Sequence, residues 1–517
     1  MRGTLTMVAA AVTLATSVLA QTTEVREIGG NKQLLIDEDM VQAMEGVEFT
    51  LNPAQRAGPV LFPDAPWEPT GLGYVTVLLD EGTFRMYYGS WEFREDIKGN
   101  WMDRVAYAES DDGIHWRKPL LGQMEYRGST ANNLLMLGHC GGYVHGGSVF
   151  IDPHAASPDE RYKMIFGDFY RIYPYEGCPQ HTTISGATSP DGIHWTGLDT
   201  PHGLLFPSGG TDTQNVCFWD PYRQAYVAYT RVNVYRKNEQ GEPYGQASRR
   251  IGRSESPVWR EFPPSEEIAA PDEDDPGGEW GCGLYNSAAT LYDWAPGVYL
   301  FFPSVHHYDN GLAEITFASS RDGIHLDRRF RERYVPIDPT AVRVGDQIGY
   351  SAYMGPGTIR MGDELWMYGI EHTTPHNSRW YGSSVGGAIH RYVQRLDGFV
   401  SLDAAGGHGT VTTKPFVLRG TRLELNARAD VVPPSPAGAP GSTVTVEVLD
   451  GEGNVLAASE PIHDDGVRLT PTWRDGADLA QLIGQPVRLR FTLDMAKLYA
   501  FQVADAEPVA IQIAPQE

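Results

Sequence analysis

Acidic residues recur at the ends of short apolar stretches in this chain. Asp168 directly follows the stretch 162–167, Asp212 precedes the apolar run 216–219, and Glu371 follows another apolar stretch. Two carboxyl groups that meet at one place could act as a general acid and a general base, or as an acid and a nucleophile. The acids that hold such positions are Glu68, Glu92, Asp168, Asp212, Glu279 and Glu371.

Aromatic, imidazole, amide and guanidinium side chains occupy the same kind of position. Polar groups of these types bind hydroxyls, and aromatic rings stack on the faces of a ring-shaped ligand, so the combination suits a sugar. The candidate ligand-binding residues are Trp67, Glu68, Trp91, Glu92, His145, Gln214, Asn215, Arg231, Tyr285, His306 and His372.

The elements that position these residues are marked by a repeat. The motif Ser-x-Asp-Gly-Ile-His occurs at 110–115, 189–194 and 320–325, with a worn copy at 254–259 and a relic at 397–399. An Asp-Gly pair forms a tight turn, because Asp bonds the nearby backbone and Gly accepts a positive φ. We expect the motif aspartates and histidines to be structural and to close successive units of the fold.

Each unit contains three predicted strands before its motif and an outer strand after it. Five such four-stranded units predict an all-β fold with a five-bladed β-propeller over residues 21–402. In a propeller, the first strand of each blade starts at the mouth of the central channel and the second strand ends there. The polar residues before first strands and after second strands should therefore converge. After residue 402 the chain changes to short alternating strands, which predict a C-terminal β-sandwich over 403–517.

The five motif-bearing units followed by a sandwich resemble the five-bladed glycoside hydrolases of the invertase/levanase and arabinanase/xylosidase type, in a secreted bacterial branch. The phrases at 160–164, 212–215, 395–402 and 413–416 also fit that branch. The resemblance implies a propeller fold and a glycosidase activity. The invertase motifs Trp-Met-Asn-Asp-Pro-Asn, Arg-Asp-Pro and Glu-Cys are absent, so catalytic carboxylates cannot be transferred from the family by motif.

Among the candidate acids, Asp168, Asp212 and Glu371 are the predicted catalytic residues, with Glu371 as the acid and Asp212 as the base or nucleophile. Each has a structural alternative: Asp168 could be a turn residue and Asp212 could cap a loop. Glu279 follows the acidic run 272–275 and is better explained as a solvated loop residue. The pair 306–307 could bind a metal with a carboxylate, but histidines more often bond a ligand or each other, so we predict no metal and no cofactor.

Composition limits the partners and the compartment. The chain has 41 basic and 66 acidic residues, a net charge of −25, which disfavours binding to nucleic acid and to anionic membranes. Residues 1–20 have the layout of a signal peptide, and no later stretch is apolar enough for membrane insertion, so we expect a secreted or periplasmic protein. The four cysteines allow two disulfides or free thiols, and the oligomeric state is left open.

These observations favour a secreted glycoside hydrolase that acts on a carbohydrate substrate, an oligo- or polysaccharide, most simply from its end. Two other functions fit the same scaffold. A non-catalytic carbohydrate-binding propeller would keep aromatic rings and hydrogen-bond donors at the mouth but no pair of facing acids. A phosphorolytic enzyme would need a basic cluster at the mouth, and a metal-assisted enzyme would need a histidine close to a carboxylate.

Overall fold

The computed structural model describes residues 24–93, 101–135, 144–168, 183–198, 205–206, 212–337, 342–344, 347–376, 387–404, 407–430 and 441–511. The protein is all-β: the described residues form strands joined by turns, with a few single-turn 3₁₀ segments. None of the described helical segments is long and apolar enough to cross a membrane. The predicted signal peptide, 1–20, lies outside the described residues.

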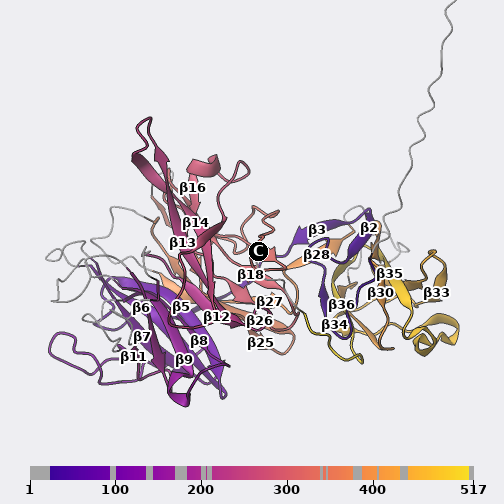
Figure 1. The fold of residues 1–517 in the computed structure, drawn as a ribbon, viewed down its shortest axis with the longest axis horizontal. Helices are drawn as coiled ribbons and strands as arrows, with labels where there is room; N and C mark the ends of the chain where they lie inside the picture. The colour runs from indigo at the N-terminus through magenta and orange to yellow at the C-terminus, as the bar shows by residue number, and fades with distance from the viewer. Residues whose placement is uncertain are drawn as a thin grey trace, which may run out of the picture.

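Three antiparallel sheets follow one another in the first half of the chain (Figure 1). The first consists of β5 (Gly71–Asp80), β6 (Thr83–Phe93) and β7 (Trp101–Ser110). The second consists of β8 (Val144–Ile151), β9 (Tyr162–Asp168), β10 (Thr183–Ser189) and β11 (Thr196–Gly197). The third consists of β12 (Val216–Asp220), β13 (Ala225–Lys237), β14 (Pro243–Ser256) and β15 (Glu266–Ala269).

The following strands form a small sheet and a large one. The small sheet contains β17 (Thr290–Leu291), β18 (Tyr299–Phe301) and β21 (Ala318–Ser320). The large sheet contains β16 (Cys282–Leu284), β19 (Ser304–His307), β20 (Ala313–Ile315), β24 (Ser351–Met354), β25 (Ile359–Met361), β26 (Glu364–His372) and β27 (Ala388–Arg395). Its last strand is β4 (Gln55–Leu61), which pairs with β27 and so joins the beginning of the chain to the last unit. A separate hairpin pairs β22 (Val342–Val344) with β23 (Gln347–Gly349).

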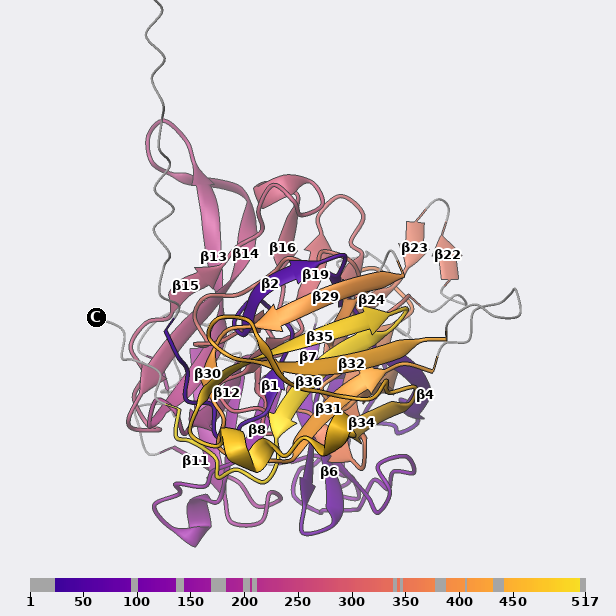
Figure 2. The ribbon, with the colours of Figure 1, turned by 90° about the vertical axis from the view of Figure 1, so that its right-hand side faces the viewer.

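The C-terminal region forms two antiparallel sheets that enclose one hydrophobic core (Figure 2). One sheet contains β1 (Gln33–Leu34), β3 (Glu48–Leu51), β28 (Val400–Asp403), β31 (Leu423–Arg428), β34 (Asp465–Leu469) and β36 (Lys497–Val503). The other contains β2 (Val41–Glu45), β29 (His408–Thr413), β30 (Phe416–Val417), β32 (Thr443–Leu449), β33 (Val455–Ala458) and β35 (Pro486–Asp494). Strict alternation in β35 buries every second side chain, which is the pattern of a sheet with one face on a core.

The predicted domain boundaries need a correction at the N-terminus. The lead-in strands β1, β2 and β3 pair with β36, β29 and β28 and therefore belong to the two-sheet unit that was assigned to 403–517. The sequence could not show this, because strand partners distant in the chain leave no local pattern. The unit thus combines both ends of the described chain. Cys217 and Cys282 are buried free thiols, while Cys140 and Cys178 lie outside the described residues.

The repeated motif has the predicted turn structure in all three clear copies. In the last copy, Asp322 Oδ1 accepts hydrogen bonds from the amides of Ile324 and His325, both at 2.8 Å, and its Oδ2 lies 2.6 Å from His325 Nδ1. The copies at Asp112 and Asp191 repeat these bonds within about 0.1 Å. The motif aspartates and histidines are therefore structural.

The motif turns also join neighbouring sheets. The Tyr368 hydroxyl of β26 donates to Gly113 O at 2.8 Å, and the Tyr229 hydroxyl of β13 donates to Gly323 O at 2.9 Å. Arg85 of β6 donates to Asp191 O at 2.7 Å. The second and third turns thus bond to the sheet before them in the chain, and the first turn bonds to the last large sheet.

A second series of contacts joins the same sheets from the ends of their first strands. Asp80, Asp152 and Asp220 each accept a hydrogen bond from a buried tyrosine of the next sheet. The donors are Tyr162, Tyr226 and Tyr299. Burial raises the pKa of all three hydroxyls, so each stays protonated and able to donate.

The close fit of the motif turns predicts a large effect of a small substitution. Gly323 has φ of +73°, and an added Cβ would lie 2.7 Å from the Tyr229 hydroxyl and 3.1 Å from the Tyr299 ring. Gly323→Ala should lower the free energy of unfolding by about 2–4 kcal/mol, from positive-φ strain and overpacking together. Urea unfolding measures the change.

The matched control is Gly362→Ala. Gly362 has a similar φ of +67°, but an added Cβ meets nothing within 4 Å. Gly362→Ala should lower the free energy of unfolding by only about 1–2 kcal/mol, from backbone strain alone. Equal losses for the two variants would show that the turn does not hold neighbouring sheets together.

Candidate functional site

The first strands β5, β8 and β12 surround a common space, which we call the channel. They begin close together, and we call this end of the channel the mouth. Tyr74 lies near the start of β5, with its ring 5.3 Å from that of His145 in β8. His145 Nε2 is in turn 2.7 Å from the carbonyl oxygen of Asp212, just before β12. Gly146, with φ of +61°, permits this approach, because a Cβ there would lie 2.7 Å from Thr213 O.

Aromatic and imidazole rings from several sheets surround the mouth. The ring centre of Tyr353 in β24 lies 5.5 Å from the ring centres of both Tyr74 and Tyr285. The ring centres of Trp91 in β6 and His372 are 5.1 Å apart. Centroid separations of this size and the edge-on or tilted ring angles are those of favourable aromatic contacts. We call this group the ring cluster; its members are Tyr74, Trp91, His145, Tyr285, His306, Tyr353, His372 and His376.

Asp103 and His145 form a pair at one side of the ring cluster. Asp103 lies near the start of β7, directly opposite Trp91 in β6, and its carboxylate contacts His145 Nδ1. Both side chains are mostly buried. A carbonyl oxygen can only accept, so His145 Nε2 carries the hydrogen that bonds to Asp212 O. An ionised carboxylate also only accepts, so a further proton is shared between His145 Nδ1 and Asp103.

Asp212 and Arg231 form a second pair. The Asp212 carboxylate is half exposed and contacts the Arg231 guanidinium, which is almost fully buried. The guanidinium also lies 5.1 Å from the centre of the Tyr285 ring. Burial lowers the pKa of Arg231 from its ordinary value, but an arginine remains charged at neutral pH. The ion pair favours an ionised Asp212 that is open to solvent.

Arg249 of β14 approaches the same tyrosine ring. Its guanidinium lies 5.0 Å from the centre of Tyr285, and Nη1 donates to His306 Nδ1 at 2.9 Å. Burial and the nearby Arg249 charge lower the pKa of His306 to about 2. His306 is therefore neutral, with Nδ1 as an acceptor and Nε2 as an N–H donor. His376 lies beside it, and burial likewise lowers the pKa of His376 well below the ordinary value.

Of the predicted site residues, seven belong to the ring cluster or its two pairs: Trp91, His145, Asp212, Arg231, Tyr285, His306 and His372. Asp168 ends β9 with its backbone paired to Val144, next to His145. Its side chain lies outside what the structure describes, so its catalytic role stays a prediction.

The contacts of Glu371 favour a structural role over its predicted role as the acid. Its carboxylate is buried and accepts two hydrogen bonds at 2.8 Å from Arg56 of β4 and one at 2.6 Å from Tyr392 of β27. Because side chains alternate along β26, Glu371 points to the face opposite His372. It holds the N-terminal strand β4 to the last unit.

Glu68 and Glu92 are likewise structural acids. Glu68 accepts from the Tyr88 hydroxyl at 2.6 Å and from Lys118 at 2.7 Å. Glu92 lies 3.2 Å from Arg104 and 2.9 Å from Arg127. Their sequence positions placed both glutamates near the mouth. In the structure, their carboxylates pair with basic side chains and hold loops to the first sheet.

Three further predicted ligand-binding residues also have structural partners. Trp67 Nε1 donates to Asn133 at 2.6 Å. The buried Gln214 donates to Val75 O at 3.1 Å and to Gly147 O at 3.3 Å, so it joins β12 to β5 and β8 inside the channel. Asn215 is fully buried and donates to Thr213 O. Glu279 pairs with Arg250 at the surface, as a solvated loop residue would.

Asp103, Arg249 and His376 were missed by the sequence reasoning. Asp103 and Arg249 lie in the third strands of their sheets, whereas the search covered only first and second strands. A third strand also starts at the mouth, so extending the search to it would have found both residues. His307 contacts Glu314 instead of the ring cluster, and no group of three or more metal-binding side chains occurs within the described ranges.

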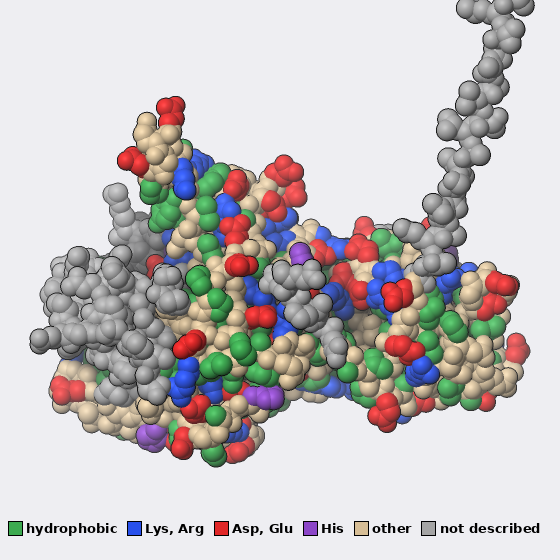
Figure 3. Space-filling model, in the orientation of Figure 1, with side chains coloured by type: hydrophobic (Ala, Val, Ile, Leu, Met, Phe, Trp, Pro, Cys, Tyr) green, Lys and Arg blue, Asp and Glu red, His purple; other side chains and the backbone are tan. Residues whose placement is uncertain are grey.

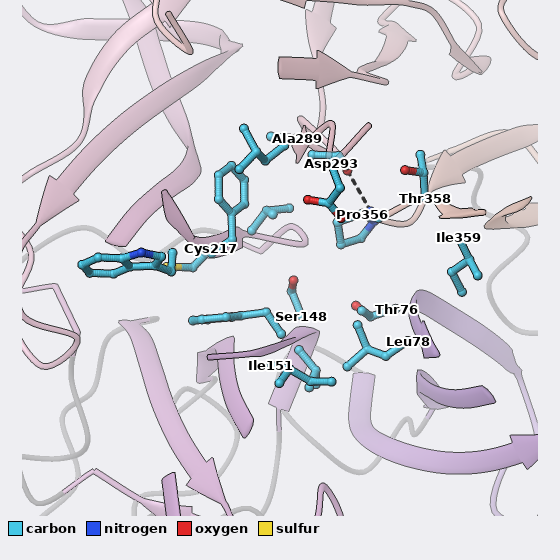
Figure 4. Close-up of a pocket in the computed structure, with 18 of the residues that line it drawn as sticks. Thr76, Leu78, Ser148, Ile151, Cys217, Ala289, Asp293, Pro356, Thr358 and Ile359 are labelled. Atoms are coloured by element: carbon cyan, nitrogen blue, oxygen red, sulfur yellow. Dashed lines mark hydrogen bonds between the residues drawn. The ribbon is translucent and has the colours of Figure 1, made fainter. Parts of the chain in front are cut away.

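A cavity of about 840 Å³ lies at the other end of the same channel (Figure 4). It is lined by the later halves of β5 and β8, by β12 and β17, and by residues 356–360. Gln214 and its partners Val75 and Gly147 separate it from the mouth. Its walls are mainly apolar, and the paired charged groups of the mouth do not line it.

Comparisons with known proteins add little to this geometry. No family model matches the chain. The uncharacterized proteins Rv1502 and MT1551 of two Mycobacterium tuberculosis strains (ATCC 25618 / H37Rv and CDC 1551 / Oshkosh) are each 28% identical over 173 residues, 32% of this chain and 47% of theirs. The chain thus matches about half the length of these curated relatives, and neither name carries a function.

Matches among solved structures include a putative glycosidase from Bacteroides thetaiotaomicron VPI-5482, with TM-score 0.42, 13% identity, and coverage of 66% of this chain and 96% of that one. A beta-1,2-mannobiose phosphorylase from Listeria innocua gives TM-score 0.43, 12% identity, and coverage of 66% and 96%. At these identities and TM-scores, neither match determines the family or the activity of this chain.

The neutral state of His306 is open to a direct test. With its pKa near 2, the imidazole should stay neutral between pH 5 and 8. NMR of protein with ¹³C-labelled histidine should show a His306 ring signal, assigned by its loss in His306→Asn, that does not shift over this range. A titration midpoint above pH 5 would show that the imidazole is not held neutral by burial and Arg249.

Proposed function

We propose that the protein is a carbohydrate-active enzyme that cleaves a glycosidic bond at the mouth. The observation that supports this most is that two acidic residues contact His145, Asp103 through its carboxylate and Asp212 through its backbone carbonyl oxygen. The ring cluster beside them offers surfaces for a sugar to stack on. Two carboxyl groups and a stacking surface are what glycoside cleavage requires.

The two carboxylates suit different roles. Asp212 is half exposed and paired with Arg231, which favours the ionised form expected of a base or nucleophile. The Asp103–His145 pair shares a proton and is mostly buried, as expected of a proton donor to the leaving oxygen. Asp103–His145 therefore replaces Glu371 as the proposed acid, and Asp212 keeps its predicted role.

The scaffold that we propose for this site is a five-bladed propeller with a β-sandwich built from both ends of the chain. Hydrogen bonds from tyrosine hydroxyls to motif turns join successive sheets, and the first motif turn is bonded to the last unit. These contacts support a closed ring. We also propose that residues 1–20 are a cleaved signal peptide and that the mature protein is secreted or periplasmic. Mass spectrometry of the protein exported by a bacterial host should find Gln21 at its N-terminus.

The catalytic proposal predicts the outcome of neutralising each acid. On the best substrate from a panel of aryl glycosides and polysaccharide digests, Asp103→Asn and Asp212→Asn should each lower kcat/KM by about 10²–10⁴-fold, since each removes a group that moves a proton or charge in the transition state. Glu279→Gln, a surface acid of similar exposure to Asp212, is the matched control and should retain activity.

Three results would discriminate among the rivals. Wild-type activity in both Asp variants would refute this site. Binding of a sugar without turnover of any substrate would favour the non-catalytic carbohydrate-binding alternative. Turnover that requires inorganic phosphate would favour the phosphorolytic one.

A further inference from the structure

We propose that the mouth binds an oxyanion between Arg231, Arg249 and His306. The anion is either the acidic group of a charged sugar or free inorganic phosphate, which share the same chemistry. This inference rests on the proposed function, because it takes the ring cluster as the place where substrate binds. It specifies the substrate class of that site.

The first supporting observation is two arginines on one tyrosine ring. The guanidinium carbons of Arg231 and Arg249 lie 5.1 and 5.0 Å from the centre of Tyr285. Like charges this close are unfavourable unless a counter-charge lies between or beside them. Asp212 supplies one negative charge to Arg231. Among the described residues, no carboxylate lies within ion-pair distance of Arg249, so these groups carry a net charge of about +1.

The second observation is a set of buried donors without partners. Arg231 Nε and Nη1 and His306 Nε2 are buried and find no hydrogen-bond acceptor within the described part of the chain. Arg231 is 7% exposed and His306 is 1% exposed. An unsatisfied buried donor costs about 1–3 kcal/mol, and more when it is charged. Both side chains contact the Tyr285 ring, and their three unsatisfied donors indicate a site that a ligand completes.

The third observation is that the polar groups these side chains leave unbonded are all donors. Arginine has no acceptor, and His306 already uses Nδ1 to accept from Arg249, which leaves its Nε2–H as a donor. A site of donors excludes an ammonium group or a metal ion as its ligand. It suits a carboxylate, sulfate or phosphate, for which arginine gives strong charge-assisted bonds.

The positive site contrasts with the rest of the molecule. The whole chain carries −25, and acidic and basic side chains are interspersed over the face shown in Figure 3. Arg250, by contrast, has two acidic partners, Glu267 and Glu279.

Isothermal titration calorimetry tests the proposal with three probes at equal ionic strength: inorganic phosphate, glucuronate and glucose. Wild-type protein should bind at least one of the two anions more tightly than glucose. Arg249→Met should lower the affinity for that anion by about 10- to 100-fold, the equivalent of one charge-assisted contact. Asp212→Asn should raise the affinity for the anion, because Arg231 then loses the carboxylate that competes with the anion.

The matched control is Arg236→Met. Arg236 also stacks on an aromatic ring, that of Trp280 at 4.9 Å, but lies outside the ring cluster, so anion affinity should not change. Arg249→Lys keeps the charge and should retain part of the affinity, which guards against misfolding of the Met variant. Preference for phosphate identifies a free anion, and preference for glucuronate identifies an acidic sugar.

Two results would overturn the inference: neither anion binds better than glucose, or Arg236→Met weakens binding as much as Arg249→Met. Because the readout is binding, it is separate from turnover. Loss of anion binding in Arg249→Met with no glycoside cleaved by wild type would refute the proposed function and leave the oxyanion site standing. If the protein cleaves a glycoside and needs Asp212 to do so, but binds neither anion in preference to glucose, the oxyanion site is refuted and the proposed function stands.

Discussion

Hydrogen bonds from buried tyrosine hydroxyls to neighbouring sheets are the interaction on which this structure depends. Tyr226 and Tyr299 reach the aspartates that end the first strands of the preceding sheets. Tyr229 and Tyr368 reach the glycine carbonyls of motif turns in the following sheets. A buried hydroxyl without an acceptor is costly, so each bond fixes the angle at which two sheets meet.

Because these angles are fixed at one end of the channel, they determine which residues meet at the mouth, which is the other end. The first strands converge so that Tyr74, His145 and Asp212 come into contact at the mouth, although they are far apart in the chain. The second and third strands then add Arg231, Asp103 and Arg249. The chemistry of the site is thus a consequence of how the sheets pack, and the motif turns, which take no part in chemistry, set that packing.

Much of this fold could be predicted from the sequence, because its signals are local. The Ser-x-Asp-Gly-Ile-His turns, the strand patterns and the units that they close all involve residues close in the chain. The pairing of β1–β4 with strands from the second half of the chain could not be predicted, because no local pattern encodes a distant partner.

The site was predicted in part for the same reason. Strand ends placed Trp91, His145, Asp212, Arg231, Tyr285 and His306 correctly beside one another. The identity of a carboxylate's partner is decided by packing, so Glu68, Glu92 and Glu371 looked like candidates although Lys118, Arg104 and Arg56 neutralise them. Asp103 and Arg249 were missed because third strands were left out of the search.

Affinity labelling tests the central claim most directly. An epoxyalkyl glycoside of the sugar that the enzyme turns over alkylates a carboxylate within reach of the bound ring, and peptide mass spectrometry locates it. We predict a label on Asp212 or Asp103, with labelling blocked by excess substrate. A substrate-protected label on Glu371, Glu68 or Glu92, or on Asp293 in the cavity at the other end of the channel, would contradict the placement of the site at the mouth.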